Sequence, residues 1–230
     1  MSKVVLITGA SRGIGLEFAK HYKANGWRVI AAVRNPATAT KLQELAVDQI
    51  VALDVVNEES VVAAAREIGA KTPINLLINN TGIYEGGSLE KTTKEDLVRQ
   101  FEINSVGPLT VTKAFLPNLQ LAAQKNEQAI FAYITSKMGS IDVNKSGGSY
   151  GYRASKAALN SIVKCLSIDL APLGIVTLLL HPGYVQTDLT GHRGDLTVAQ
   201  SIEAMSSTLE KVAAKDNANF YDIDGTLLPW

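Results

Sequence analysis

A tyrosine and a lysine in this sequence are spaced so that they can act together on a proton. Tyr152 and Lys156 are four residues apart, which on a helix places them on one face, about 6 Å from each other. A free tyrosine has a pKa near 10, and lowering it by about 3 units takes about 4 kcal/mol, which a nearby ammonium group can supply. The pair therefore predicts a tyrosine with a lowered pKa. Tyr150 is a rival phenol, but the residue four positions on, Ala154, carries no charge.

Taken alone, the pair is better explained as two exposed side chains on a helix, and two further polar residues change that interpretation. Ser136 closes the β-rich run 129–135, so its hydroxyl is expected at the same sheet edge. Asn104 lies where one helical pattern gives way to the next. Its amide can hold a water and interrupt regular helical bonding, at a place where bulges form. The four residues together favour a catalytic site.

A glycine-rich turn follows the first predicted strand. It reads Thr8-Gly9-Ala10-Ser11-Arg12-Gly13-Ile14-Gly15, with the glycines spaced Gly-x-x-x-Gly-x-Gly. Glycines permit a tight turn and a close approach of the backbone to a pyrophosphate, while the start of a helix offers free N–H groups and a partial positive charge. Because a strand precedes the turn and a helix follows it, the segment predicts a dinucleotide site rather than a ligand-free turn.

The end of the second predicted strand indicates which dinucleotide is bound. Proteins that bind NAD place an acidic residue here, which accepts a hydrogen bond from the ribose 2′-hydroxyl. This chain has Arg34 and Asn35 instead, with no acid in reach. Arg34 and Arg12 can clamp a 2′-phosphate, with each charge-assisted hydrogen bond worth about 1.5–3 kcal/mol. The sequence therefore predicts NADP(H), and the alternative interpretation of Arg34 is a solvated loop arginine.

Two more predicted strands end in residues that suit a nucleotide site. Asp54 and Val55 follow the third strand, where a carboxylate can accept from the adenine amino group. Asn80-Thr81-Gly82 follows the fourth strand, at the edge where open α/β sheets bind ligands. Asp54 is also a candidate for the N-cap region of the helix that begins near Glu58. Its position at the carboxyl end of a strand favours the binding site.

The elements that must position these residues alternate along the chain. Short apolar runs predict strands at 3–8, 28–33, 49–53, 75–79, 129–135, 175–181 and 221–227. Helical patterns occupy 14–25, 38–46, 58–70, 94–104, 106–124, 151–173 and 198–215. Runs that are apolar throughout, such as residues 4–7, are typical of strands buried on both faces. The alternation predicts an α/β fold, a single-domain Rossmann fold over residues 1–230, with a doubly wound parallel sheet of about seven strands and helices on both faces.

Composition excludes several classes of protein. Lys plus Arg equal Asp plus Glu at 22 each in the 230 residues, so the chain lacks the basic surface that nucleic-acid binding requires. No apolar run approaches the roughly 18 residues that span a bilayer, so no membrane partner is expected. The lack of a signal-peptide pattern and the single cysteine, Cys165, predict a cytoplasmic protein. Cys165 is expected in the core, and three scattered histidines with one cysteine predict no metal site.

Seven motifs, in this order and spacing, resemble those of the short-chain dehydrogenase/reductase family over essentially the whole chain. They are 8–15, Asp54-Val55, 79–82, Asn104, Ser136, Tyr152-x-x-x-Lys156 and Pro182-Gly183. The resemblance implies that Tyr152 is the general acid/base and that Ser136 orients the carbonyl and stabilises the developing oxyanion. It also implies that Lys156 holds the nicotinamide ribose and lowers the tyrosine pKa, and that Asn104 anchors a proton-relay water. Beyond Pro182-Gly183, Val185 and Thr187 would meet the nicotinamide carboxamide.

Within the family, the chain resembles the small carbonyl reductases of the sniffer and C-factor kind. The likeness lies in residues 32–36, 104–108, 152–156 and 224–230. It implies NADPH-dependent reduction of ketones and aldehydes. The alternative is a dinucleotide-binding signalling or regulatory protein of the C-factor kind with incidental reductase activity, although such a protein needs none of the four polar residues. An epimerase or dehydratase fits the glycine spacing poorly.

Departures from the family pattern bear on the substrate and on assembly. Thr81 stands where the family usually has alanine, and the segment 186–196 is short and polar. A short lid predicts an open pocket that accepts several small carbonyl substrates. The long helices at 106–124 and 151–173 are expected to form a homodimer face. The polar end of the first helix favours a monomer instead, through Gln120, Gln124, Lys125 and Asn126.

Overall fold

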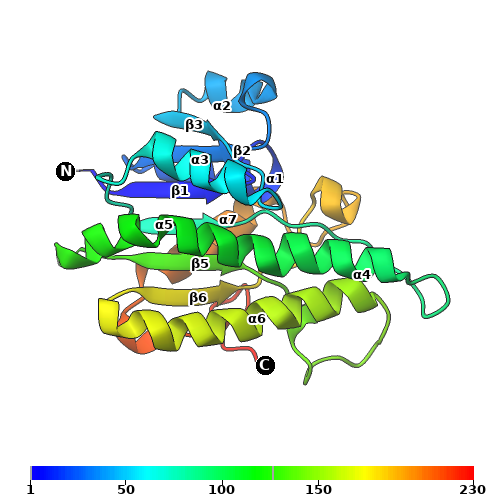
Figure 1. The fold of residues 1–230 in the computed structure, drawn as a ribbon. Coiled ribbons are helices and arrows are strands. Elements are labelled where there is room, and N and C mark those ends of the chain that lie inside the picture. Colours follow the sequence, from blue (N-terminus) through cyan, green and yellow to red (C-terminus); the bar gives the residue numbers. More distant parts are fainter. Residues whose placement is uncertain (1, 126) are drawn as a thin grey trace.

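Seven parallel strands form one sheet through the middle of the protein (Figure 1). The structure is a computed structural model that describes residues 2–125 and 127–230, so Asn126, assigned above to a polar helix end, lies outside the described residues. The strands are β1 (Val4–Thr8), β2 (Arg28–Val33), β3 (Gln49–Ala52), β4 (Leu76–Asn79), β5 (Ile130–Ile134), β6 (Val176–Leu180) and β7 (Phe220–Tyr221). Their order in the sheet is β3-β2-β1-β4-β5-β6-β7. The predicted doubly wound Rossmann fold is confirmed, and its switch point lies between β1 and β4.

Helices cover both faces of this sheet (Figure 1). One core receives side chains from α1 (Gly13–Ala24), α2 (Thr40–Glu44) and α7 (Val198–Glu210). The core on the other face receives them from α3 (Glu58–Ile68), α5 (Gly107–Gln124) and α6 (Tyr150–Leu170). α4 (Lys94–Phe101) is joined to α5 by a π-helical turn (Glu102–Val106) and extends past the carboxyl ends of the strands. Among the described residues, no helix is both long enough and apolar enough to cross a membrane.

The apolar strands supply both cores at once. Val4 and Leu6 of β1 belong to one core, while Val5 and Ile7 belong to the other. Successive side chains of a strand point to opposite faces, so a strand between two helical layers must be apolar at every position. This is why the sequence shows continuous apolar runs where an open sheet would alternate with polar residues.

Side chains fix the starts of α3, α4 and α7. Asn57 caps α3 by accepting a hydrogen bond from the Ser60 amide (3.0 Å), and Thr93 and Asp96 form a capping box at the start of α4. α6 differs, because Ser149 precedes it in a left-handed conformation (φ 50°) without a side-chain cap. A non-glycine residue in that region is strained and needs support from its surroundings.

Several predicted boundaries of helices and strands are wrong. The strand expected at 221–227 is only β7, because a turn centred on Asp224-Gly225 reverses the chain and lets Leu227 bridge back to Tyr221 in antiparallel fashion. The helix expected at 198–215 ends at Glu210, after which Ala214–Asp216 forms a separate 3₁₀ turn. The helix expected at 38–46 divides into a 3₁₀ turn (Pro36–Thr38) and the short α2.

Cys165 is exposed, which corrects the expectation that it lies in the core. The buried stripe of α6 runs through Leu159, Val163 and Leu170. At 3.6 residues per turn, position 165 lies to the side of that stripe. The cysteine therefore faces outward.

Candidate active site

The turns after β1 and β4 are tied to each other beside the switch point of the sheet. Thr8 Oγ1 accepts hydrogen bonds from the amides of Asn80 (3.0 Å) and Thr81 (3.2 Å). The side-chain amide of Asn80 donates in return to the carbonyl oxygens of Thr8 (3.0 Å) and Gly9 (3.2 Å). Asn80 therefore fixes the glycine turn, and the segment 80–82 follows it along the same edge.

The glycine turn leaves space for a ligand at the start of α1. Gly9 and Gly13 both adopt left-handed backbone conformations (φ 65° and 52°). At Gly15, a Cβ would meet the carbonyl oxygen of Gly9 and would lie 2.6 Å from Asn80 Nδ2. α1 begins at Gly13 with neither a side-chain cap nor an acidic residue in its first turn. Free N–H groups at the helix start together with a glycine cradle fit a pyrophosphate.

A hollow of about 370 Å³ lies at the end of β2. Its lining consists of Ser11, Val33, Arg34, Asn35 and Thr38, with no acidic residue among them. Asn35 shapes this loop, because its side chain accepts from the Ala37 amide (3.1 Å). An exposed arginine beside a serine hydroxyl is suited to a phosphate monoester.

Arg12 takes no part in lining this hollow. Its Nε lies 3.4 Å from Asp188 Oδ2, and both side chains are exposed. The expected clamp of Arg12 with Arg34 is therefore not formed in this structure, since Asp188 offers Arg12 a carboxylate on the other side of the turn.

Asp54 stands at the end of β3, as expected of a residue that meets a base. Its Oδ1 accepts from the Val56 amide (3.2 Å). Because the N-cap of α3 is Asn57, the alternative assignment of Asp54 to the capping of that helix is wrong. The next residue, Val55, packs closely against the start of α5, where a Cβ at Gly107 would lie 2.9 Å from Val55 Cβ.

Ser136, Tyr152 and Lys156 are brought together at the carboxyl end of β5. All three are buried, with 7%, 8% and 4% of their surfaces exposed. The Ser136 hydroxyl lies near enough to Tyr152 to affect its pKa, and it accepts a hydrogen bond from the Met138 amide (3.1 Å). Lys156 Nζ lies 5.9 Å from the centre of the Tyr152 ring and donates to the Ile134 carbonyl oxygen (2.8 Å).

Burial shifts the pKa values of this pair in opposite directions. It raises the pKa of Tyr152 to about 12, although the neighbouring Ser136 hydroxyl acts the other way. It lowers the pKa of Lys156 to about 8. The expected lowering of the tyrosine pKa is therefore wrong for the protein by itself, because burial of the phenol dominates its pKa. At neutral pH the phenol is protonated, which is the state of a proton donor.

Asn104 lies in the π-helical turn, where a bulge was expected. In this turn the Gly107 amide bonds to the Glu102 carbonyl, five residues back. Asn104 Oδ1 accepts from the Ile83 amide (2.8 Å), while Nδ2 donates to the Ile83 carbonyl (3.0 Å) and to Ser155 Oγ (3.0 Å). Both N–H groups of its amide are used, so the side chain holds the loop after β4 and has no donor left for a water.

The segment after β6 folds back toward the glycine turn. Gly183 is left-handed (φ 81°), and Val185 is buried in a bridge with Leu196. Pro182 accepts a hydrogen bond at its carbonyl from a serine of α7 (2.7 Å). A Cβ at Gly13 would lie 3.7 Å from Thr187 Cγ2. The segment expected to be an open, short lid is therefore ordered against the predicted nucleotide site.

Two residues of this region carry no signal in the sequence. Gln100 is fully buried in α4, and its side chain pairs with the amide (3.0 Å) and the carbonyl (3.2 Å) of Glu85. The Tyr84 ring lies edge-on against Tyr152, with 4.9 Å between the ring centres. Both contacts join loop and helix residues 15 or more positions apart, so no local spacing reveals them.

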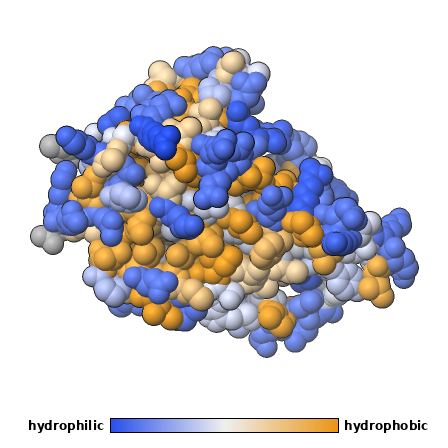
Figure 2. Space-filling model, viewed as in Figure 1, coloured by the Kyte–Doolittle hydropathy of each residue, from blue (hydrophilic) through white to orange (hydrophobic). Residues whose placement is uncertain are grey.

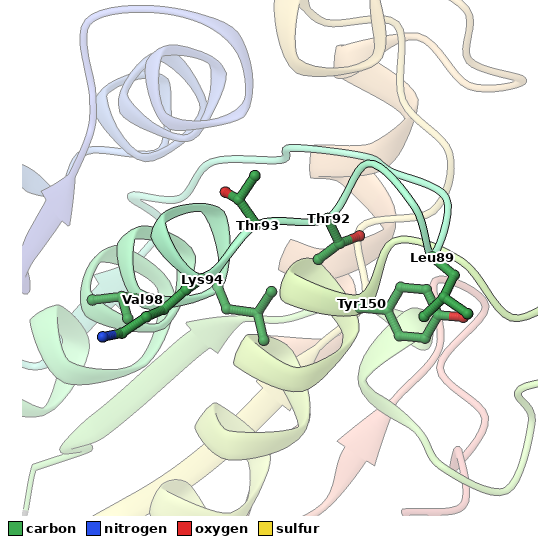
Figure 3. Close-up of a pocket in the computed structure, with 7 residues that line it drawn as sticks. Leu89, Thr92, Thr93, Lys94, Val98 and Tyr150 are labelled. Atoms are coloured by element: carbon green, nitrogen blue, oxygen red, sulfur yellow. The ribbon is translucent and has the colours of Figure 1, made fainter.

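A separate hollow of about 480 Å³ lies between the starts of α4 and α6 (Figure 3). It is lined by Leu89, Thr92, Thr93, Lys94, Leu97, Val98 and Tyr150. Because Tyr150 lies in this hollow, the rival phenol is not part of the group formed by Ser136, Tyr152 and Lys156.

Comparison with known proteins agrees with this geometry. Residues 3–197 match the family model for short chain dehydrogenase. The crystal structure of an NADPH-bound carbonyl reductase from chicken fatty liver is 36% identical, with a TM-score of 0.94 over 100% of this chain and 99% of that one. The carbonyl reductase Sniffer of D. melanogaster is 32% identical, also with a TM-score of 0.94, over 100% of both chains. C-signal of Myxococcus xanthus is 42% identical over 159 residues, which are 69% of this chain and 93% of that protein.

Proposed function

The chain belongs to the short-chain dehydrogenase family of oxidoreductases, and on this premise we propose that it reduces ketones and aldehydes to alcohols with NADPH. The observation that carries the proposal is the joint burial of Ser136, Tyr152 and Lys156, with Lys156 Nζ 5.9 Å from the centre of the Tyr152 ring. The likeness to an NADPH-bound carbonyl reductase over the whole chain supports the choice of reaction and of cofactor.

The polar residues can carry the proton half of such a reduction. When bound, NADPH would supply the hydride for the carbonyl carbon, and the carbonyl oxygen would then need a proton. Tyr152 would give its phenolic proton to that oxygen, and the neighbouring Ser136 hydroxyl would orient the carbonyl and stabilise the developing charge. Lys156, charged below a pKa of about 8, stabilises the tyrosinate that remains.

The proton given up by Tyr152 must be replaced before the next turnover. We place the relay water at the π-helical turn, held by backbone groups that regular helical bonding does not use. Asn104 has no N–H group left for this water, because both of its amide protons are donated to Ile83 and Ser155.

The cofactor residues take the roles that the geometry suits. The glycines at 9, 13 and 15 and the start of α1 would receive the pyrophosphate. Arg34 with Ser11 and Asn35 would receive the 2′-phosphate in the hollow at β2, and Asp54 with Val55 would meet the adenine. Pro182, Gly183, Val185 and Thr187 would hold the nicotinamide end, beside the segment 80–82.

The likeness to C-signal favours a second candidate function. In this alternative the protein binds the dinucleotide as a signalling or regulatory protein and its reductase activity is incidental. The enzyme is favoured because Ser136, Tyr152 and Lys156 are all present and all buried. Lys156 is also fixed to the end of β5 by its bond to the Ile134 carbonyl.

Substitution of Tyr152 tests the reaction. Tyr152→Phe keeps the ring and its packing but removes the proton, so we expect NADPH binding to persist and carbonyl reduction to fall at least about a hundredfold. Binding is followed by NADPH fluorescence, and turnover by NADPH oxidation over aldehydes, α-diketones, ketoesters and steroids. Near-normal turnover in this variant would overturn the mechanism. Wild-type protein that binds NADPH but reduces none of these compounds would favour the signalling alternative.

For assembly, we propose a homodimer through the outward faces of α5 and α6. In Figure 2 hydrophobic residues gather over the face on which these helices lie. Ile168 of α6 is 64% exposed and Val106, just before α5, is 38% exposed.

A further inference from the structure

The loop after β4 presents an aromatic ring to the proton donor. The ring planes of Tyr84 and Tyr152 meet at 84° with their centres 4.9 Å apart, an edge-to-face arrangement that aromatic pairs favour. Tyr84 is 41% exposed, whereas Tyr152 is 8% exposed. Tyr84 is therefore a partly exposed aromatic side chain in contact with Tyr152.

Two side-chain amides of the neighbouring helix pin the backbone on both sides of this tyrosine. Asn104 bonds the amide (2.8 Å) and the carbonyl (3.0 Å) of Ile83. Gln100, one helical turn earlier, bonds the amide (3.0 Å) and the carbonyl (3.2 Å) of Glu85. Each side-chain amide pairs with both the backbone N–H and the backbone C=O of one loop residue. The backbone of residues 83 and 85 therefore has both of its hydrogen-bonding groups satisfied, as in a strand of a sheet.

The far end of the Tyr84 side chain is anchored as well. Its hydroxyl forms a hydrogen bond with Ser149 Oγ (3.0 Å), at the left-handed residue that starts α6. The loop also closes round it, since a Cβ at Gly86 would lie 2.7 Å from the hydroxyl oxygen. The ring is thus ordered on folding, and a ligand that packs on it does not bear the entropic cost of ordering it.

Resting on the reductase function proposed above, we propose that Tyr84 determines substrate specificity by selecting carbonyl compounds whose carbonyl carbon bears a flat, apolar ring. Such a ring packs on the open surface of Tyr84 while the carbonyl oxygen meets the Tyr152 hydroxyl. An uncharged ring suits the surface that Tyr84 presents, because the carboxylate of the adjacent Glu85 already pairs with Arg99 (3.0 Å).

Matched aldehydes separate this role from general effects on activity. Benzaldehyde and cyclohexanecarbaldehyde have the same carbon skeleton, but only the first has a flat ring. The difference in their intrinsic reactivity is the same for every variant. A change in the ratio of their kcat/KM values therefore reports a change in the packing of the substrate on the Tyr84 ring. We expect the ratio to fall about twofold to tenfold in Tyr84→Leu, the scale of an aromatic pair contact. Tyr84→Phe keeps the ring but loses the bond to Ser149, so its ratio should lie closer to the wild-type value than that of Tyr84→Leu.

Tyr150→Leu is the matched control, because Tyr150 is 42% exposed and lines the separate hollow of Figure 3. We expect it to keep the wild-type ratio. An unchanged ratio in Tyr84→Leu, or an equal fall in Tyr150→Leu, would overturn the inference.

A binding measurement keeps the two proposals distinguishable. Wild-type protein that reduces neither aldehyde would count against the reductase function. The role of Tyr84 is then tested without turnover. Saturation-transfer NMR measures the binding of benzyl alcohol and of cyclohexylmethanol to NADP⁺-loaded protein. Weaker binding of benzyl alcohol alone in Tyr84→Leu would support the inference, and equal binding in both proteins would overturn it.

Discussion

The lysine beside Tyr152 sets the pH range in which the protein can work. Burial lowers the pKa of Lys156 to about 8, while the phenol stays protonated up to about 12. An amine is charged below its pKa and loses its charge as the pH rises through that value. Reduction needs both the phenolic proton and the ammonium, so kcat/KM for NADPH should be level below about pH 7 and fall through pH 8. This ratio reports the ionisations of the free enzyme.

The variant Lys156→Met identifies the group responsible for that fall. It has no ammonium to lose, so its residual activity should be low and level between pH 6 and pH 9. A persistent fall near pH 8 in this variant would assign the ionisation to another group.

Arg34 decides between the two dinucleotides in our interpretation. Arg34→Asp replaces the cation of the β2 hollow with an acid that can accept from a ribose hydroxyl and repels a phosphate. The ratio of kcat/KM for NADPH to that for NADH should fall about a hundredfold or more, which corresponds to about 3 kcal/mol. Arg12→Ala is the comparison, and its effect should be smaller because Arg12 pairs with Asp188. If this ratio is unchanged in Arg34→Asp, Arg34 is a solvated loop arginine that does not contact the cofactor.

Residues with local spacing were predictable from the sequence, and residues with distant partners were not. Tyr152 and Lys156 lie one turn apart on one helix, and the glycines 9, 13 and 15 lie on one turn. The pKa of Tyr152 depends instead on burial and on a strand end 16 residues earlier, and this is why its direction was misjudged. The partner of Arg12 lies in a segment 176 positions away, and nothing near Arg12 in the sequence indicates it.

Close packing between two elements holds the catalytic residues at their distances. The 3₁₀ turn Lys137–Gly139 carries the chain from Ser136 past α6. A Cβ at Gly139 would lie 2.9 Å from both the carbonyl carbon and the Cβ of Lys156. Gly139→Ala must push these elements apart, so we expect a loss of about 1–3 kcal/mol in unfolding free energy. The value of kcat should fall with it, while NADPH affinity is kept.

Gly147→Ala separates stability from geometry in that experiment. A Cβ at Gly147 would meet no atom within 4 Å, but the φ of 63° makes alanine strained there. This substitution should therefore lower stability by about 1 kcal/mol without lowering kcat. Equal losses of kcat in the two variants, followed by NADPH oxidation and chemical unfolding, would show that the Gly139 effect is one of stability alone.

Element types were more predictable than element ends. The break near Asn104 was expected because a polar residue interrupts two apolar helical patterns, and the π-helical turn lies there. The ends of α7 and β7 were overestimated because apolar residues continue past them, at Val212 and Leu227. These residues pack after the chain has turned, which periodicity alone does not distinguish from a longer helix or strand.

At the scale of the whole molecule, the two halves of the sheet have different predicted roles. The strands β1 to β3 with their turns form the predicted dinucleotide half, whereas β5 and α6 carry the polar group that acts on the carbonyl. The segments that connect the halves are the loop after β4, held by Asn104 and Gln100, and the segment after β6, which reaches back toward Gly13. The fold class followed from the βα alternation, but these cross-connections depend on tertiary packing.

The homodimer proposed through α5 and α6 makes a prediction about the size of the particle in solution. Helices of 18 and 21 residues are about 30 Å long, and a strip two helices wide offers roughly 600 Å² per chain. The roughly 1,200 Å² buried by two copies is at the lower end of stable interfaces. Light scattering after gel filtration should therefore show a dimer that dissociates on dilution. Ile168→Glu places a charge at a 64% exposed position of α6 and should give a monomer, whereas Ile141→Glu, at a 79% exposed loop position, should leave the dimer intact. A wild-type protein that is monomeric at every concentration would favour the interpretation drawn from the polar end of α5.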